Sequence, residues 1–310
     1  MLCVSNKIVE ANQDGSNRDK FEVMIASVDG QPIHCQNNTV FTPHCTIDDI
    51  DDADIILIPA ISEIEKTLKT EHKLVDWLVK KHQQGIIIGS ACTGAFLLAE
   101  TGLLDGKLAT THFSAVNDFK HRYPKVKMKP EHMVTDEGNL LCSGGASSCE
   151  DLALYLIEKY INRKVAVKSA KMFVRDYRRI SQAPYFEFEG NTKHTDTQIL
   201  LCQRWLENNH SNNIEIKNLS SIASMSQRTF ERRFKKATGY TPLLYLQKLR
   251  VTNAKKLLET TDQSFDAIAC SVGYKNCGAF RKVFVRDTNL LPSEYRNKFN
   301  AKQAGEIVRA

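Results

Sequence analysis

A change of hydrophobic periodicity near residue 198 constrains the fold more than any other feature of the sequence. Before that point, short β-branched runs such as Asp54–Ile58 and Gly85–Ile88 predict strands, and they alternate with stretches whose apolar residues recur at helical spacing. The other such segments are Phe21–Val28 for a strand and, for helices, Glu63–Lys81 and the stretches that begin at Thr93 and at Glu150. Strands that alternate with helices predict a mainly parallel sheet covered on both faces, which is an α/β domain.

Beyond residue 198 no stretch predicts a strand, and the periodic stretches all predict helices. These helices are Ile199–Asn208, Leu219–Met225, Ser226–Thr238, Pro242–Thr260, Phe265–Val272 and Cys277–Asp287. Residues 189–198 (EGNTKHTDTQ) are polar and lack an apolar anchor, which predicts a linker. We therefore expect an α/β domain over residues 1–188, this linker, an all-helical domain over residues 199–298 and a C-terminal tail over residues 299–310.

The two parts of the chain differ in charge. Residues 1–198 carry 23 lysines and arginines against 27 acidic residues, whereas residues 199–310 carry 19 against 9. The basic part fits a solvated cationic surface, and it equally fits a face for nucleic-acid phosphates, where each neutralised phosphate releases counterions. Charge alone does not decide between the two.

The composition argues against several other classes of protein. No apolar run approaches the roughly 18 to 20 residues of a membrane span, and the N-terminus lacks the basic region and apolar run of a signal peptide. The nine cysteines include no CxxC pair and match no ligand spacing, which predicts reduced thiols and no metal site. We expect a cytoplasmic protein with no cofactor and no membrane partner.

The basic part contains a helix-turn-helix pattern between Leu219 and Gly239 (LSSIASMSQRTFERRFKKATG). Two helices meet at a break before Ser226, and Phe230 and Phe234 of the second helix face inward at i,i+4 spacing. The outward face of this second helix carries Arg228, Glu231, Arg232 and Lys235. A helix buried on one side with such residues on the other is what base recognition requires.

The pattern recurs about fifty residues later in FDAIACSVGYKNCGAFRKVFVRD, where Phe280 and Phe284 face inward. The outward positions of this second unit are Cys277, Gly278, Arg281 and Lys282. Between the units, Pro242–Thr260 predicts a helix of roughly 28 Å at 1.5 Å per residue. That length is near the roughly 34 Å between successive major-groove faces on one side of a duplex, so one chain would reach two of them.

Residues 222–258 (IASMSQRTFERRFKKATGYTPLLYLQKLRVTNAKKLL) and 268–296 (IACSVGYKNCGAFRKVFVRDTNLLPSEYR) together resemble the DNA-binding domain of the AraC/XylS regulators. The resemblance implies that the residues facing DNA bases are Arg228, Glu231 and Arg232 in the first unit and Cys277, Gly278, Arg281 and Lys282 in the second. Lys235 is expected to contact phosphate. Cys277 and Gly278 are smaller than the polar side chains usual in the family, which argues against strong base recognition there.

A second motif lies in the α/β part, where GSACTGAFLLAE (residues 89–100) follows an apolar run and predicts a strand, a sharp turn and a helix. Cys92 stands between small residues, as the nucleophile of a strained elbow does, and near a helix N-terminus that favours thiolate. His112 follows twenty residues later and is a candidate base. The local pattern leaves three roles open for Cys92, which are a buried structural residue, part of a binding pocket without turnover, and a catalytic nucleophile.

The stretches SACTGAFLLAETGLLDGKLATTHF and LLCSGGASSCEDLALYLIE resemble the PfpI-type, class I glutamine-amidotransferase-like domains of GlxA-like AraC regulators. The resemblance covers roughly residues 1–185 and implies a flavodoxin-like sensor that binds a small metabolite, with nitrogen-containing compounds suggested. The effector pocket that we expect is lined by Cys92, Thr93, His112, Gly144 and Gly145. An aromatic box for a quaternary amine would require Phe96, Phe113, Phe119 or Tyr123 to converge.

Two departures from this family argue against catalysis. Thr93 stands where the peptidase-like members have histidine, and residues 1–4 match the inside of the family's first helix. The first strand, with the acidic partner of the cysteine, is therefore expected to be missing. We favour an effector pocket without turnover over a catalytic site.

The predicted function is a sequence-specific DNA-binding transcriptional regulator controlled by a metabolite, and not an enzyme. The expected partners are double-stranded DNA, a small-molecule effector, RNA polymerase and a second copy of the chain in a homodimer. The alternative is a cysteine hydrolase, of the amidase or peptidase kind, that uses Cys92 and His112.

Overall fold

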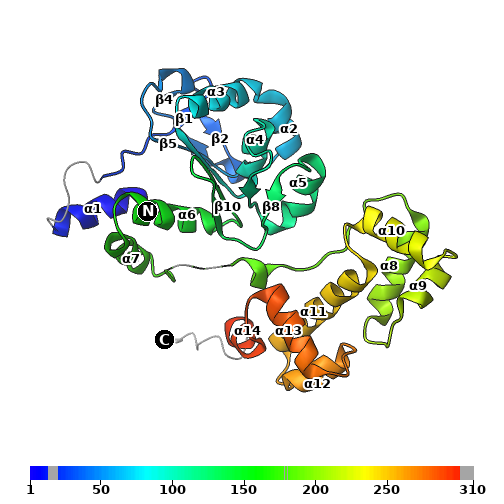
Figure 1. Cartoon of the computed structure of the whole chain (residues 1–310). Coiled ribbons are helices and arrows are strands. Elements are labelled where there is room, and N and C mark those ends of the chain that lie inside the picture. Colours follow the sequence, from blue (N-terminus) through cyan, green and yellow to red (C-terminus); the bar gives the residue numbers. More distant parts are fainter. Residues whose placement is uncertain (13–19, 178, 180, 301–310) are drawn as a thin grey trace. The chain divides into compact units, whose positions relative to one another are not determined.

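The computed structural model describes residues 1–12, 20–177, 179 and 181–300. The chain divides into two compact units, unit 1 over Met1–Gln182 and unit 2 over Ala183–Ala310 (Figure 1). Most of the predicted C-terminal tail, residues 301–310, lies outside the described residues. Among the described helices, none has both the length and the apolar character needed to cross a membrane.

Unit 1 is an α/β domain, as the alternating pattern predicts. Its strands are β1 (Ala26–Ser27), β2 (Ile33–His34), β3 (Val40–Phe41), β4 (Cys45–Thr46), β5 (Ile55–Ile58), β6 (Ile87–Ala91), β7 (Leu108–Ala109), β8 (Lys127–Met128), β9 (Val134–Asp136) and β10 (Leu140–Ser143). Its α-helices are α1 (Leu2–Asn12), α2 (Ile64–Thr70), α3 (His72–Gln83), α4 (Ala95–Glu100), α5 (Val116–Arg122), α6 (Ser148–Tyr160) and α7 (Arg163–Met172). Its 3₁₀ helices are η1 (Gln36–Asn38), η2 (Ile47–Asp49), η3 (Cys92–Gly94) and η4 (Phe113–Ala115).

The central sheet of unit 1 has the order β5-β6-β10-β9. Strands β5, β6 and β10 run parallel, with Ile56 opposite Ile88 and Ser90 opposite Cys142, and β9 is antiparallel to β10. Three two-stranded pairs complete the strand pairing among the described residues, and they are β1 with β4, β2 with β3, and β7 with β8. The predicted parallel sheet is thus confirmed for the three strands that carry the longest apolar runs.

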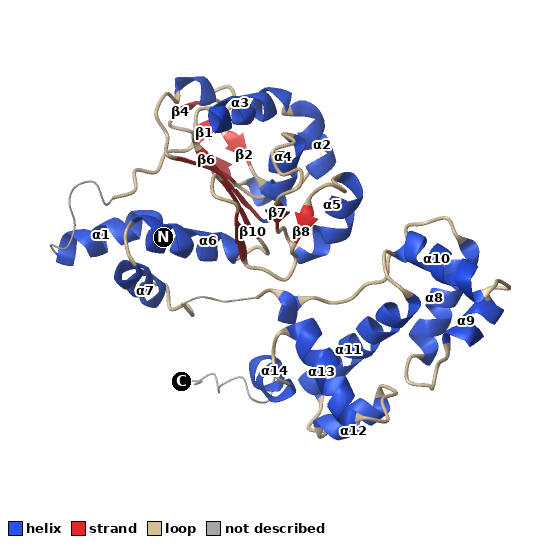
Figure 2. Cartoon of the chain, in the orientation of Figure 1, coloured by secondary structure: helices blue, strands red, loops and turns tan. Residues whose placement is uncertain are grey.

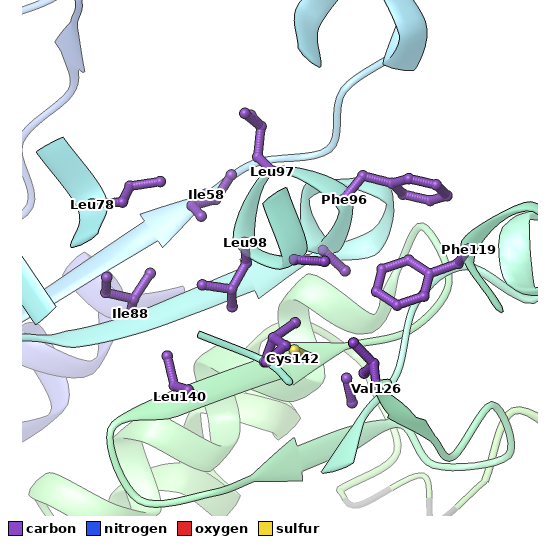
Figure 3. Packing of buried hydrophobic residues seen from close by; sticks show 14 of the residues in the cluster. Ile58, Leu78, Ile88, Phe96, Leu97, Leu98, Phe119, Val126, Leu140 and Cys142 are labelled. Atoms are coloured by element: carbon purple, nitrogen blue, oxygen red, sulfur yellow. The ribbon is translucent and has the colours of Figure 1, made fainter. Parts of the chain in front are cut away.

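Successive residues of these strands point to opposite faces of the sheet, and helices cover both faces. On one face, strand residues pack with α3, α4 and α5 in a core whose members include Ile58, Leu78, Ile88, Leu98, Phe119, Leu140 and Cys142 (Figure 3). On the other face, Leu141 packs with Leu152 and Leu156 of α6. Full burial of such a side chain contributes roughly 1.5 to 3 kcal/mol.

The strand predicted over Phe21–Val28 is wrong for its first residues, since only Ala26 and Ser27 pair with another strand. The side chain of Asn6 in α1 takes the place of a neighbouring strand at Phe21. Its Nδ2 donates to the Phe21 carbonyl at 2.8 Å, and its Oδ1 accepts from the Phe21 N–H at 2.9 Å. The Phe21 ring then packs with the helix layer of α1 and α6.

Unit 2 is all-helical in its described residues (Figure 2). Its α-helices are α8 (Thr197–Asn209), α9 (Ile216–Ile222), α10 (Gln227–Thr238), α11 (Pro242–Thr260), α12 (Phe265–Ser271), α13 (Cys277–Thr288) and α14 (Pro292–Phe299), and η5 (Ala183–Tyr185) precedes them. Each of the six predicted helices is present, and α14 adds one at the P-x-x-Y-R stretch.

Two separate hydrophobic cores share the long helix α11. Its N-terminal half contributes Tyr245 and Leu246 to a core with α8, α9 and α10. Its C-terminal half contributes Val251 and Leu258 to a core with α12, α13 and α14. The 19 residues of α11 therefore join two helix-turn-helix bundles as one stiff element.

Residues 189–198, which the sequence predicts to be a linker, are held to unit 2 in the structure. Asn191 donates from Nδ2 to the Ala237 carbonyl at 3.1 Å, and Gln203 donates from Nε2 to the Asn191 carbonyl at 3.0 Å. Just before them, the Phe188 ring packs edge-on against Tyr245 at 4.9 Å between centroids. The polar residues bind through side-chain to backbone hydrogen bonds, which hydrophobic patterning does not reveal, so the division falls after residue 182 and not after 188.

Candidate DNA-binding face and effector pocket

Helix α10 is placed by its two ends and by its buried face. Ser226 is the N-cap and accepts a hydrogen bond from the Thr229 N–H, and Gly239 ends the helix in the left-handed conformation at φ 81°. Phe230 and Phe234 are both fully buried. This burial fixes the rotation of the helix, so that the opposite face carries the predicted DNA-binding residues.

The outward residues of α10 form a cationic surface. Arg228, Arg232 and Lys235 are exposed, and no ion pair or hydrogen bond of the described residues involves their side chains. Glu231 is also exposed, and its carboxylate accepts a hydrogen bond from Gln227 at 2.9 Å, which stays on the same helix. Unpaired cations on one helix face attract an anionic polymer.

Helix α13 is held in the same way as α10, but it presents fewer free cationic side chains. Asn276 is the N-cap, and Phe280 and Phe284 are fully buried. Lys282 is exposed, whereas the Arg281 guanidinium lies 3.7 Å from the Asp266 carboxylate and over the Phe265 ring.

Cys277 and Gly278 precede these residues on α13. The Cys277 side chain is half-buried and its thiol approaches the carbonyl of Asp266 at 3.7 Å, so it is turned towards α12. Gly278 is exposed and presents only backbone. The second unit therefore presents fewer free polar side chains than the first, in line with its small residues.

The two bundles are locked to each other near the middle of α11. Arg250 donates from Nε to the His210 carbonyl at 2.7 Å and from its guanidinium to the Asn212 carbonyl at 2.8 Å, while its other side faces the Tyr274 ring. The backbone of Gly273 passes so close that a Cβ there would lie 2.6 Å from the Ser211 carbonyl oxygen. These contacts hold α10 and α13 at a fixed separation along α11.

In unit 1, Cys92 lies at a strained turn. Strand β6 ends at Ala91, and Cys92 has a φ of 55°, which non-glycine residues rarely adopt. A Cβ on Gly94 would lie 2.3 Å from the Pro59 carbonyl oxygen, so only glycine fits two residues after the cysteine. The Cys92 carbonyl accepts a hydrogen bond from the Thr111 hydroxyl at 2.9 Å. The turn has the geometry of a nucleophile elbow.

The electrostatics of the turn favour neutral groups. Burial raises the pKa of the Cys92 thiol, although the backbone N–H and hydroxyl of Thr93 act in the opposite direction. Burial lowers the pKa of His112. The His112 Nδ1 is engaged by the Ser114 hydroxyl at 2.8 Å, and no hydrogen bond joins the Cys92 thiol to the His112 ring in the described part of the chain. A raised thiol pKa and a lowered imidazole pKa are the reverse of the shifts that an activated cysteine–histidine pair requires.

The Thr93 hydroxyl stabilises the elbow through hydrogen bonds to Ile61. It donates to the Ile61 carbonyl at 2.6 Å and accepts from the Ile61 N–H at 2.9 Å. The hydroxyl thus joins the elbow to the loop that follows β5, and it is not a spare donor for a ligand.

The Gly-rich turn, Ser143 to Gly145, comes close to His112. A Cβ on Gly145 would lie 3.8 Å from Cδ2 of His112. The Gly144 N–H donates to the Met133 carbonyl at 2.9 Å, and the Gly145 N–H donates to Oε1 of Gln182 at 2.9 Å. Gln182 is 2% exposed and was not anticipated, because no periodicity or motif marks a buried glutamine in SQAPY.

The candidate aromatic box is not an open box. Phe96, Phe119 and Tyr123 do converge, with ring centroids 4.9 to 6.1 Å apart, but they pack against one another within the core. Phe113 lies elsewhere and stacks on the His112 ring at 4.4 Å. These rings leave no space for a quaternary amine among themselves.

Comparisons with known proteins agree with both halves of this description. The chain matches the helix-turn-helix domain model over residues 219–298 and the DJ-1/PfpI family model over residues 12–159. It is 26% identical over 285 residues to the HTH-type transcriptional regulator GbdR of Pseudomonas aeruginosa. This match covers 91% of this chain and 76% of GbdR. The regulator CdhR of the same species is 25% identical (90% of this chain, 82% of that protein), and GlxA of Rhizobium meliloti is 25% identical (69% and 66%).

Proposed function

The chain is a transcriptional regulator that joins a DJ-1/PfpI domain to an AraC-type helix-turn-helix domain, and we propose that α10 and α13 bind specific double-stranded DNA under the control of a small effector held in unit 1. The observation that carries the DNA part is the face of α10. Its three exposed cations have no partner in the described structure, while the neighbouring Arg233 is paired with Asp196.

The geometry of unit 2 supports contact with two successive major-groove segments. Helix α11 has 19 residues, about 28 Å at 1.5 Å per residue, and the contacts of Arg250 keep the two bundles from swinging about it. A fixed separation of two recognition helices restricts binding to sites whose two segments have the matching spacing. A homodimer and RNA polymerase as a partner remain predictions, and so does the cytoplasmic location that the composition suggests.

The effector part is supported by the chemistry around the elbow. Burial raises the pKa of the Cys92 thiol at the elbow and lowers the pKa of His112, and a Cβ on Gly145 would lie 3.8 Å from Cδ2 of His112. These groups offer hydrogen bonds to a polar ligand, and neither pKa shift activates the thiol as a nucleophile. A nitrogen-containing metabolite is the effector class that the resemblance of residues 90–113 supports.

The test is recovery of fragmented genomic DNA on the purified full chain at about 0.15 M salt, where non-specific binding is weakened. We expect sharp peaks that share one motif. The matched control is the chain with Arg228, Arg232 and Lys235 all replaced by alanine, which should give no shared motif. Diffuse recovery that is identical for both proteins would contradict the proposal.

A cysteine hydrolase is the second candidate, and the strained φ of Cys92 is the observation that favours it. The assay is hydrolysis of simple esters, amides and peptides by the wild-type chain and by Cys92→Ser. Turnover that the substitution abolishes would establish the hydrolase. Equal background rates in both proteins would support the sensor.

A further inference from the structure

One short segment connects the two units, and each of its ends is held by hydrogen bonds within one unit. Gln182 is the last residue of unit 1 and Ala183 is the first residue of unit 2. We call Ser181–Phe186 the tether. Its two ends are held by different side-chain interactions, and a single peptide bond separates them.

The unit 1 end is held by the side chain of Gln182, and the Gln182 N–H and the Ser181 hydroxyl also donate to the Glu131 carbonyl, at 3.0 and 2.9 Å. The Gln182 Nε2 lies within hydrogen-bond distance of the carbonyls of Pro130 at 2.6 Å and Thr111 at 3.1 Å, and further acceptors from Thr110 and His132 lie at 3.1 and 3.3 Å. Its Oε1 accepts from the Gly145 N–H at 2.9 Å. A buried amide with all its polar atoms paired is costly to displace unless another group replaces its partners.

The same end of the tether borders the Gly-rich turn. Gln182 touches this turn so closely that a Cβ on Gly144 would lie 2.4 Å from its Nε2. The Gly145 N–H that Gln182 occupies belongs to a residue whose Cβ would lie 3.8 Å from Cδ2 of His112. A ligand oxygen placed beside His112 would therefore compete with Gln182 for this N–H.

The unit 2 end is held by Lys255, a residue of α11 that is 4% exposed. Its ammonium group donates to the carbonyls of Phe186 at 2.8 Å, Pro184 at 3.3 Å and Ala183 at 3.4 Å. A buried ammonium depends on such acceptors, because no water replaces them. The tether therefore cannot slide along unit 2 without leaving a buried charge unpaired.

We propose that Gln182 couples the effector pocket to DNA binding, and that an effector oxygen, from a carboxylate or carbonyl group, acts by taking the Gly145 N–H from it. Displacement of the Gln182 side chain moves the start of the tether. Because Lys255 holds the next residues, the movement is passed to α11, the helix that joins both helix-turn-helix bundles. This inference rests on the proposed function, since it requires unit 2 to bind DNA and the elbow to bind the effector.

The experiment displaces the Gln182 side chain by a substitution instead of by an effector. Gly144→Ala places a methyl group where the Gln182 amide lies, and it is combined with a second change, the insertion of two glycines between Gln182 and Ala183. The insertion leaves both anchors intact and makes the tether slack. The probe is a DNA duplex enriched from a random-sequence pool by the wild-type full chain. The readout is the Kd of this duplex for four proteins, namely the wild type, Gly144→Ala, the two-glycine insertion and the two changes combined.

We expect Gly144→Ala to change the Kd by between about twofold and about thirtyfold with the native tether, the range of typical coupling effects. With the slack tether the same substitution should change the Kd less than twofold. Leu78→Val, in the core of unit 1 away from the tether, is the control for a general loss of unit 1 stability and should leave the Kd unchanged. Gln182→Leu serves as the second variant if Gly144→Ala does not fold.

Two outcomes overturn the coupling alone. One is DNA binding that Gly144→Ala and Gln182→Leu leave unchanged, and the other is an equal change with native and slack tethers. Failure of the wild-type chain to enrich any duplex is a different result. It refutes the proposed function and, with it, the premise of the coupling.

Discussion

Substitutions of two adjacent arginines on α10 should have opposite effects, one on DNA binding and the other on stability. The Arg232 side chain is exposed and forms no ion pair or hydrogen bond among the described residues, so Arg232→Ala should change the free energy of unfolding by no more than about 0.5 kcal/mol. If Arg232 binds a base edge, the same change should weaken specific DNA binding by about 1 to 3 kcal/mol, which is about 5-fold to about 150-fold in Kd.

Arg233 is expected to matter for stability and not for recognition. Its guanidinium donates two hydrogen bonds to the Asp196 carboxylate, at 2.9 and 2.8 Å, and Asp196 is also the N-cap of α8. The Arg233 side chain is 40% exposed, so solvent screening keeps the loss of stability in Arg233→Ala small but measurable. The free side chain of Arg232 and the paired side chain of Arg233 thus provide controls for each other.

The assays are urea unfolding and titration of a labelled duplex carrying the enriched site, with each base pair of the site substituted in turn. Arg232→Ala should relax discrimination at one position. Weaker binding to all sequences alike, with a salt dependence reduced by about one counterion, would instead make Arg232 a phosphate contact. Loss of specific affinity in Arg233→Ala at unchanged stability would refute the reasoning, because it would mean that the ion pair to Asp196 does not form.

Three further substitutions test the packing. Gly190→Ala would bring a Cβ within 1.8 Å of the Tyr245 hydroxyl oxygen and should destabilise the chain by about 1 to 3 kcal/mol in urea, whereas a neutral result would contradict the close approach. Val174 has a φ of 51° and is 95% exposed, so Val174→Gly should stabilise by about 1 kcal/mol in the same assay. Burial lowers the pKa of Lys255 to about 8 from 10.5. Between pH 8 and pH 10.5 the unfolded chain therefore binds more protons at Lys255 than the folded chain does. The free energy of unfolding of the wild type should rise relative to that of Lys255→Met as pH rises from 8 to 10. A difference between the two proteins that stays constant with pH would refute the pKa shift.

The sequence predicts most of the helices and two of the three parallel strands, β5 and β6, because burial of apolar side chains leaves a periodic pattern, whereas the parallel strand β10 is not predicted. The apolar runs at Ile55–Ile58 and Ile87–Ala91 and the paired phenylalanines of α10 and α13 are examples. The elbow at Cys92 is also recognisable, because only small residues fit around it.

The features that sequence reasoning misses depend on single polar side chains. Gln182 holds the Gly-rich turn, Lys255 holds the tether, and Asn6 replaces a neighbouring strand at Phe21. Each of these residues satisfies backbone groups that are distant in the sequence, so neither spacing nor composition indicates its partner. The same holds for the expected linker, whose polar residues turn out to bind unit 2.

The internal repeat of unit 2 separates positions that the scaffold fixes from positions that recognition leaves free. Five buried residues recur as the same type fifty positions later, and they are Phe230 and Phe280, Phe234 and Phe284, Thr238 and Thr288, Pro242 and Pro292, and Tyr245 and Tyr295. The roles recur too, since the Thr238 hydroxyl donates to the Phe234 carbonyl at 2.7 Å and that of Thr288 to the Phe284 carbonyl at 2.8 Å.

The outward positions of the repeat do not recur as the same residues. Arg228, Glu231 and Arg232 correspond to Gly278, Arg281 and Lys282. Two bundles with the same skeleton and different outward side chains present different hydrogen-bonding groups to the two groove segments. We therefore expect an operator whose two segments differ in sequence, with stronger base preference in the segment bound by α10, and enrichment of two identical segments would contradict this assignment of the outward residues.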